Sequence, residues 1–201
     1  MAKAFDVVLA SASPRRRELL QQIGLRCRVL PVAIDEAQLA GEAPADYVTR
    51  LAREKALAAS ALSECDTSLP VLGADTIVEL DGELLGKPAD SGQAEAMLAR
   101  LSGNRHRVHT AVAVICNGEV NTRLQTSRVS FAELGPAQIH AYVASGEPLD
   151  KAGAYGIQGG AAAFIRHLEG SFSSVMGLPL YETAALLAHC GVVPKYNIRK
   201  L

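Results

Sequence analysis

Short apolar runs and helical repeats of apolar residues follow one another along most of the chain. The short runs are typical of strands in a buried sheet, and we expect strands at residues 5–9, 26–32, 71–80, 105–116 and 119–124. Apolar residues at three- and four-residue spacing predict helices, which we expect over residues 14–23, 44–62, 90–101, 135–145 and 180–190. Strands that alternate with helices favour an α/β fold with a mixed sheet and flanking helices.

Two turn signals support this arrangement. Asp81-Gly82 and Asn117-Gly118 each separate two strand-like segments, and such dipeptides favour the two-residue turns of β-hairpins. Residues 125–131 are expected to continue the second hairpin as a further strand. Hairpins place antiparallel pairs in a sheet that helical crossovers make partly parallel, so a mixed sheet is the prediction.

Composition and charge narrow the class of protein. Hydrophobic residues make up 49% of the 201 residues, aromatic residues only 4%, and the formal net charge is −1. A chain so nearly neutral has no general attraction to nucleic acid or to a membrane surface, and no apolar stretch reaches the roughly 18 residues of a membrane span. Widely spaced cysteines without a C-x-x-C pair predict reduced thiols in a cytoplasmic protein; they are Cys27, Cys65, Cys116 and Cys190.

Three arginines stand at the start of the first expected helix, directly after Pro14. Cations are unfavourable at a helix N-terminus by a few tenths to about 1 kcal/mol each, but a bound anion reverses the sign. Arg15 and Arg16 are therefore candidate phosphate ligands, with Ser11 and Ser13 beside them, and Arg17 is expected to point away. The alternative is a solvated helix start with Arg17 paired to an acid.

Two acidic positions are candidates for chemistry. Asp75 interrupts an apolar strand, and a buried carboxylate needs a cation, a metal or a catalytic role as its reason. A turn carboxylate that caps backbone N–H groups is the alternative for Asp75. Glu36, next to Asp35 on a loop, is a solvated acid unless the fold brings it to a site.

Two lysines are candidates for phosphate neutralisation. Lys55 lies within a charged helical run from Arg50, which is ordinarily a solvated face with near-neighbour pairs. Lys87 is held between Gly86 and Pro88, where a fixed point charge suits a phosphate, although a surface loop explains it equally well. The segment before it is no P-loop, because only three residues separate its glycines and Pro88 replaces the metal-binding Ser or Thr.

Taken together, six ordered segments resemble the Maf family of nucleoside triphosphate pyrophosphatases. They span nearly the whole chain and read SASPRR from Ser11, LAREKA from Leu51, GADTIV from Gly73, GKP from Gly86, DKAGAYGIQG from Asp150 and VMGLP from Val175. The resemblance implies an elongated, two-lobed Maf/ITPase-like architecture with a central cleft. It also implies a single domain over residues 1–201, with a basic tail at about 193–201.

The activity that this resemblance implies is hydrolysis of the α–β phosphate bond of dTTP and UTP, or of modified pyrimidine nucleotides, to the monophosphate and pyrophosphate. It implies Mg²⁺ or Mn²⁺ as the divalent cofactor, a homodimer in the cytoplasm, and no nucleic acid or membrane partner. Within the family, a 7-methyl-GTP pyrophosphatase is the alternative. Outside it, the alternative is a regulatory protein that binds nucleotides without hydrolysing them.

The resemblance also assigns roles to individual residues. Asp75 is similar to the catalytic proton acceptor of the family, and Glu36 with Asp75 to its metal ligands. The residues that resemble triphosphate contacts are Ser11, Ser13, Arg15, Arg16, Lys55 and Lys87. Arg16, Thr76 and Gln158 resemble the specificity set of the dTTP/UTP branch. Ser174 departs from the asparagine of many relatives, which leaves a contact to base or backbone in doubt there.

Overall fold

A computed structural model describes residues 4–195 and divides the chain into two compact units. Unit 1 is formed by the described residues of Met1–Asp75, Thr110–Gln125 and Gly177–Leu201, and unit 2 by Thr76–His109 and Thr126–Met176. The single domain over residues 1–201 stays a prediction, and most of the expected basic tail lies outside the described residues.

The strands form one mixed sheet. In chain order they are β1 (Val7–Leu9), β2 (Cys27–Val29), β3 (Val71–Leu80), β4 (Glu83–Leu85), β5 (Arg105–Cys116), β6 (Glu119–Phe131) and β7 (Ile165–Glu169). The order is β2-β1-β3-β5-β6-β7, with β4 paired to β3 outside this path. β1 is parallel to β2 and β3, whereas β3 with β4 and β6 with β7 are antiparallel. The predicted α/β fold with a mixed sheet is confirmed.

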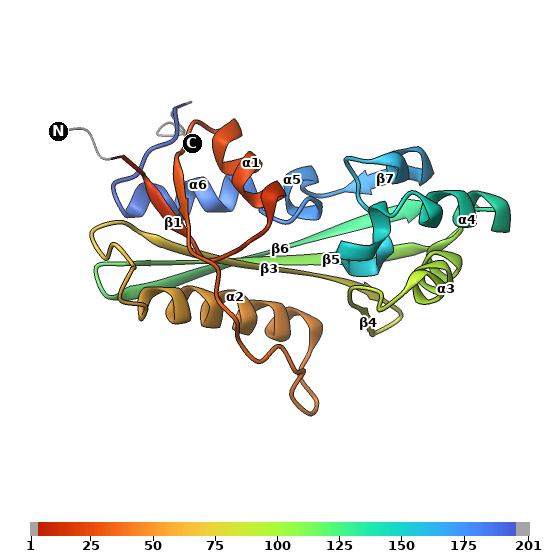
Figure 1. The fold of residues 1–201 in the computed structure, drawn as a ribbon, viewed down its shortest axis with the longest axis horizontal. Helices are drawn as coiled ribbons and strands as arrows, with labels where there is room; N and C mark the ends of the chain where they lie inside the picture. Colours follow the sequence, from red (N-terminus) through yellow and green to blue (C-terminus); the bar gives the residue numbers. More distant parts are fainter. Residues whose placement is uncertain (1–3, 196–201) are drawn as a thin grey trace. The chain divides into compact units, whose positions relative to one another are not determined.

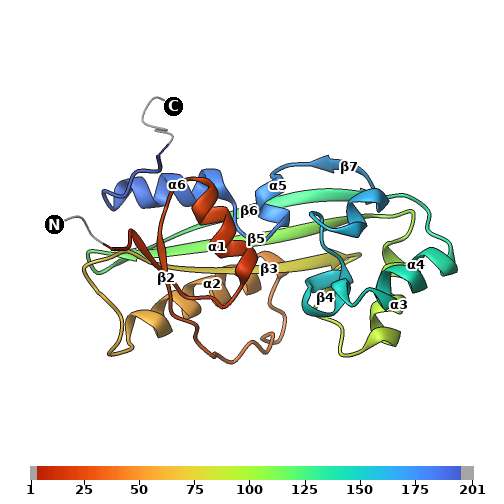
Figure 2. The ribbon, with the colours of Figure 1, turned by 45° about the horizontal axis from the view of Figure 1, so that its top comes forward.

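In unit 1, helices lie on both sides of the strands. Figures 1 and 2 show α2 (Pro44–Ser60) on one side and α1 (Pro14–Gln22) with α6 (Leu180–His189) on the other. α2 approaches β3 closely at Gly73, where an added Cβ would lie 2.3 Å from the backbone oxygen of Ala52 and 2.6 Å from the nitrogen of Ala56. Only glycine permits this approach, and it brings the middle of α2 to the strand that carries Asp75.

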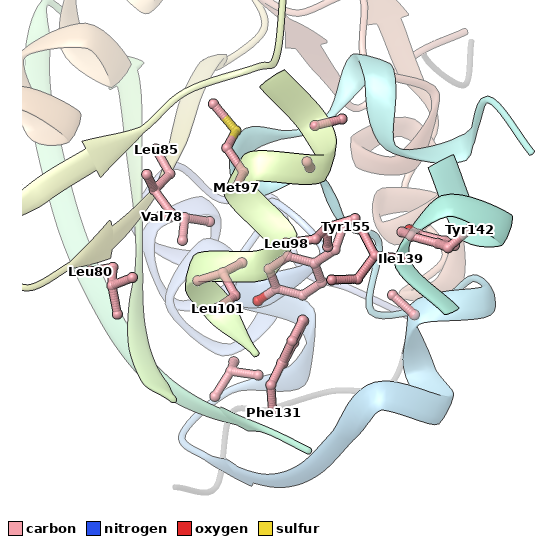
Figure 3. Packing of buried hydrophobic residues seen from close by; sticks show 14 of the residues in the cluster. Val78, Leu80, Leu85, Met97, Leu98, Leu101, Phe131, Ile139, Tyr142 and Tyr155 are labelled. Atoms are coloured by element: carbon pink, nitrogen blue, oxygen red, sulfur yellow. The ribbon is translucent and has the colours of Figure 1, made fainter. Parts of the chain in front are cut away.

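In unit 2, a large apolar cluster packs between the sheet and the helices α3 (Ser91–Leu101) and α4 (Pro136–Ala144), and Figure 3 shows part of it. At its centre the rings of His106, Phe131 and Tyr155 meet edge to face, and a ring nitrogen of His106 shares a 2.8 Å hydrogen bond with the Tyr155 hydroxyl. Burial lowers the pKa of His106 to about 4, so this histidine is a neutral core residue.

Short elements complete unit 2. They are the 3₁₀ turns η1 (Glu147–Asp150), η2 (Ala152–Ala154) and η3 (Gly160–Phe164), and the helix α5 (Phe172–Val175). The glycine-rich stretch of the sequence therefore forms a succession of tight turns. Gly153 has a φ of +70°, and a side chain there would also meet Val78 at 2.9 Å.

Most element bounds agree with the sequence pattern. β3 has the predicted bounds, and both hairpin dipeptides have positive φ at each residue, as the mirror-image turn requires. One difference is that β6 runs unbroken through residues 119–131, where two strands were expected. The first half of β6 is exposed or half-buried. Its polar residues are therefore the solvated part of one long strand, and they do not mark a break between two strands.

The prediction of four reduced thiols is wrong for two of them. A disulfide joins Cys116, in the last residue of β5, to Cys190, which caps the end of α6. Their Cα atoms lie 6.0 Å apart although 74 positions separate them in the chain, and such a distance is set by packing that no local spacing reveals. Cys27 and Cys65 are free thiols.

Across residues 4–195, none of the helices is long and apolar enough to cross a membrane.

Candidate active site

The start of α1 holds a fixed arginine. Ser11 Oγ accepts hydrogen bonds from the Ser13 N–H at 3.2 Å and from Arg16 Nη1 at 3.0 Å, and Arg16 Nε donates to the Gly177 carbonyl at 2.8 Å. Ser13 is the N-cap residue of α1, but its side chain makes no capping hydrogen bond. Arg16 is therefore oriented by two neighbours before any ligand arrives.

The three arginines of α1 have different surroundings. Burial lowers the pKa of Arg16, and this shift is opposed by the charges of Asp75 and Glu36 and reinforced by Arg15, so the guanidinium interacts electrostatically with all three. Arg15 is half-buried, whereas Arg17 is exposed and forms no ion pair within residues 4–195. The pairing of Arg17 with an acid is thus not found, and its outward position agrees with the prediction.

A lysine and two carboxylates meet beside this arginine. Lys55 Nζ lies 2.6 Å from Asp75 Oδ1 and 2.7 Å from Glu36 Oε1. The side chains of Lys55 and Asp75 are only 12% and 11% exposed, whereas that of Glu36 is 57% exposed. Asp75 lies within β3 and pairs with a cation, so it is not the turn carboxylate of the alternative interpretation. Lys55 is likewise not part of a solvated helix face.

The loop that carries Glu36 is fastened to α2. Tyr47 donates from its hydroxyl to the Glu36 carbonyl at 2.8 Å, and Arg50 donates to the Ala37 carbonyl at 3.0 Å and to both carboxylate oxygens of Glu42 at 2.6 and 2.8 Å. The hydrogen bonds that Arg50 donates to Glu42 raise the pKa of Arg50. Arg50 was expected on a solvated face, and this is wrong because it spans from the helix to the loop. No local pattern marked Tyr47, Arg50 or Glu42 as supports of Glu36.

The two carboxylates fit a divalent cation of the kind that the resemblance implies. Glu36 and Asp75 supply hard oxygen ligands, and both reach the same nitrogen of Lys55, so they face one small volume. Mg²⁺ is commonly held by one or two carboxylates together with substrate phosphates. Within residues 4–195, no group of three or more His, Cys, Asp or Glu side chains has the arrangement of a metal centre.

The remaining predicted site residues belong to unit 2. Lys87 and Gln158 are both exposed, and Thr76, the residue after Asp75, is half-buried. The segments of Lys87 and Gln158 are joined through the backbone, because the Gly153 N–H of η2 donates to the Gly86 carbonyl at 3.0 Å. Unit 2 therefore presents an exposed lysine and an exposed amide from two connected loops.

Ser174, which departs from the family pattern, is fully buried in α5. Its backbone N–H donates to the Ser171 hydroxyl at 3.2 Å, which caps this short helix. A buried position in a helix accounts for a small side chain here, and the loss of a family contact at this position stays a prediction.

Comparison with known proteins gives this geometry its context. The family described as Maf-like protein matches residues 6–190. A protein of Nitrosomonas europaea named dTTP/UTP pyrophosphatase is 50% identical over 196 residues, covering 92% of this chain and 95% of the relative. A protein with the same name from Shewanella denitrificans is 55% identical, and the match covers 90% of this chain and 94% of the relative. A third, from Neisseria gonorrhoeae, is 48% identical, and the match covers 96% of this chain and 97% of the relative.

Among solved structures, the Ham1 protein of Staphylococcus aureus is similar with a TM-score of 0.42 and 16% identity, over 63% of this chain and 72% of that one. The match to the family extends over nearly the entire chain and includes every residue of the arginine, lysine and carboxylate cluster. The chain belongs to the Maf-like protein family.

Proposed function

We propose that this chain is a nucleoside triphosphate pyrophosphatase that hydrolyses the α–β bond of dTTP and UTP, releasing the monophosphate and pyrophosphate. The relatives from three bacteria that carry the name dTTP/UTP pyrophosphatase support the reaction and the substrates. The observation that carries the proposal is the meeting of Asp75, Lys55 and Glu36 next to the fixed guanidinium of Arg16.

The cations account for triphosphate binding. A nucleoside triphosphate carries about four negative charges, and phosphoryl transfer is catalysed mainly by positioning and by neutralising charge on the transferred and leaving oxygens. Arg16 is held by Ser11 and Gly177 and so presents its remaining N–H groups in a defined direction. Arg15, Lys55 and the exposed Lys87 supply further positive charge for the phosphates.

Asp75 is the proposed proton acceptor. Its Oδ1 is paired with Lys55, whereas its Oδ2 accepts no hydrogen bond from residues 4–195. Because Oδ2 is not engaged by these protein donors and the side chain keeps 11% of its surface exposed, this oxygen can accept the proton of an attacking water. Lys55 holds the carboxylate of Asp75 in place. Because Lys55 is also paired with Glu36, its charge is divided between the two acids.

Glu36 and Asp75 are the proposed ligands of Mg²⁺ or Mn²⁺. A divalent cation bound by these carboxylates and by substrate phosphates supplies charge neutralisation and lowers the pKa of coordinated water. Tyr47 and Arg50 keep Glu36 at this position by fastening its loop to α2.

Gln158 and Thr76 are the proposed specificity residues, together with Arg16. A side-chain amide donates and accepts hydrogen bonds, which matches the N3–H and carbonyl pattern of a uracil or thymine edge. We also infer from the family a homodimer in the cytoplasm.

The test is a substrate panel with Mg²⁺. Purified protein is incubated with dTTP, UTP, CTP and 7-methyl-GTP, and pyrophosphate and orthophosphate are measured separately. We expect pyrophosphate and monophosphate from dTTP and UTP, at least tenfold faster than from the other two. Orthophosphate with a diphosphate would contradict the bond assignment. Faster turnover of 7-methyl-GTP would assign the other branch, and binding of UTP with no metal-dependent product would indicate the regulatory protein.

A further inference from the structure

The carboxylate of Glu147 is the centre of a hydrogen-bond network around the loop that carries Gln158. Its Oε1 accepts from the Tyr142 hydroxyl at 2.8 Å, and its Oε2 accepts from the Gly160 N–H at 2.9 Å. Tyr142 is buried on α4, and its hydroxyl in turn accepts from the Gly156 N–H at 3.1 Å. The two ends of the segment 156–160 are therefore connected to one carboxylate, directly or through one tyrosine.

The loop lies so close to the side chains of Glu147 and Lys151 that a Cβ at either of two loop glycines would displace one of them. An added Cβ at Gly159 would lie 1.9 Å from Glu147 Oε1, and one at Gly156 would lie 2.8 Å from Cε of Lys151. Lys151 also donates to the backbone carbonyl of Glu147 and to Asp150, which fixes the turn that carries the carboxylate. Gln158 is the one position between these contacts whose side chain is free to project, and it is exposed.

The chemistry of the network favours a rigid loop. Burial raises the pKa of Tyr142, and the hydrogen bond to Glu147 raises it further against the opposing Gly156 N–H, so the phenol stays a donor at neutral pH. Hydrogen bonds to a carboxylate are shorter and about twice as strong as those between neutral groups. Both carboxylate oxygens of Glu147 accept hydrogen bonds within this network, one from Tyr142 and one from the Gly160 N–H, so the side chain serves the loop.

We propose that Glu147 is a positioning residue for base recognition, which holds segment 156–160 so that the amide of Gln158 meets the pyrimidine edge in one orientation. This proposal rests on the proposed function, because it takes Gln158 as the base-reading residue. UTP and CTP present opposite donor and acceptor patterns at N3 and C4. A loop held at both ends starts the Gln158 side chain from one place and in one direction. This lowers the ordering cost of presenting the amide to one of these patterns, and a loose loop loses that advantage.

The test compares Glu147→Ala, Glu147→Gln and the control Glu133→Ala, a change of an exposed glutamate of unit 2 that makes no hydrogen bond within residues 4–195. For Glu147→Ala we expect KM for UTP to rise about tenfold, kcat to stay within twofold, and the ratio of kcat/KM for UTP over CTP to fall at least fivefold. Glu147→Gln keeps one acceptor and should lie between Glu147→Ala and the wild type.

A double-variant cycle distinguishes positioning from a general structural effect. In a Gln158→Ala background, Glu147→Ala should no longer change the UTP to CTP ratio, because Glu147 acts on that ratio only through Gln158. An unchanged ratio in the single variant, or an equal loss in both backgrounds, would overturn the proposal. Melting temperatures of each variant show whether the fold is retained.

A binding experiment keeps the proposal separate from the proposed function. Calorimetric titration of the metal-free protein with UTP and with CTP measures selectivity without turnover, and the same variants and cycle apply. If the wild type releases no pyrophosphate but its UTP preference in binding depends on Glu147 through Gln158, the hydrolytic function fails and the positioning role stands. If turnover is normal and Glu147→Ala leaves the preference for UTP in binding unchanged, the positioning role is wrong and the hydrolytic function stands.

Discussion

Strand β3 carries two buried carboxylates, and their surroundings differ. Within residues 4–195, the side chain of Asp75 has one hydrogen-bond partner, Lys55, which it shares with the exposed Glu36. Glu79, four positions later, accepts from Arg107 at 3.0 Å, from the Gly82 N–H at 3.2 Å, and shares a 2.9 Å hydrogen bond with His109. Burial alone would raise the pKa of Glu79, but the bonds from His109 and Arg107 outweigh it, and the pKa lies below its ordinary value.

The two carboxylates therefore differ in how many of their oxygens can still accept a hydrogen bond or a proton. Both oxygens of Glu79 have protein partners, so this side chain joins β3 to β5 and has no oxygen left for chemistry. Asp75 Oδ2 accepts no hydrogen bond from the described part of the chain. Lys55 and Arg16 both interact with this acid and with Glu36, and Arg15 interacts with Arg16. A buried acid in a strand is thus a functional candidate only where its partners leave part of it unused.

The largest effect should come from exchanging each acid for its amide. Asp75→Asn removes the proposed proton acceptor and should lower pyrophosphate release from UTP about 10³-fold, whereas Glu79→Gln should stay within threefold of the wild type. Steady-state pyrophosphate assays with Mg²⁺ measure both. Comparable losses in the two variants would remove the distinction between the carboxylates, and retained turnover in Asp75→Asn would remove its catalytic role.

A smaller loss should follow from reversing charge on α1. Arg16→Glu places a negative charge next to Asp75 and Glu36 and removes the bonds to Ser11 and Gly177, so kcat/KM for UTP should fall about 10²-fold. Arg17→Glu changes the same charge at an exposed position of the same helix and should cost less than threefold. Thermal melting checks that both variants fold. Equal damage at the two positions would show that the cations beside Asp75 act only through overall charge.

The smallest effect is one on stability. Glu79→Gln weakens a buried cluster and should lower the free energy of unfolding at pH 7 by about 1–3 kcal/mol. Because the folded-state pKa of Glu79 is depressed, its contribution is present above the unfolded value of 4.5 and is lost as the pH falls through the folded value. Urea unfolding from pH 7 to pH 3 should therefore show the two proteins converging below about pH 4.5.

The buried His106 supplies the internal control for that experiment. Its pKa of about 4 in the folded state means that the wild type also loses stability between pH 6.5 and pH 4, as the unfolded chain binds protons first. This loss is common to the wild type and to Glu79→Gln, so it cancels in their difference. A difference that stays constant down to pH 3 would contradict the role of Glu79 as an ionised partner.

Local pattern was sufficient for most of the fold and for the start of the site. The bounds of β3 follow from the apolar residues on both sides of Asp75, and Asp75 stands out because it is a carboxylate between them. The different surroundings of Arg16 and Arg17 follow from helical geometry, since adjacent residues point in different directions. The family and its dTTP/UTP relatives were also predicted correctly from six short motifs.

Long-range contacts were not predictable from one sequence. Arg16 is fixed by the carbonyl of Gly177, 161 positions away, and a backbone acceptor leaves no side-chain signal. Glu79 had no local signal in the sequence, because its partners Arg107 and His109 come from another strand. Arg50 looked solvated for the same reason, since Glu42 and Ala37 reach it only when the loop folds back on α2.

The disulfide between Cys116 and Cys190 gives the chain a closed covalent path. Residues 117–189 become a ring that begins and ends in unit 1 and contains all of Thr126–Met176, the larger share of unit 2. While this bond is intact, a single peptide cleavage anywhere in the ring opens the circle without releasing a fragment. The segments that carry Glu147, Gln158 and Gly177 are thus covalently connected to unit 1 by two routes, one through Cys116 and one through Cys190.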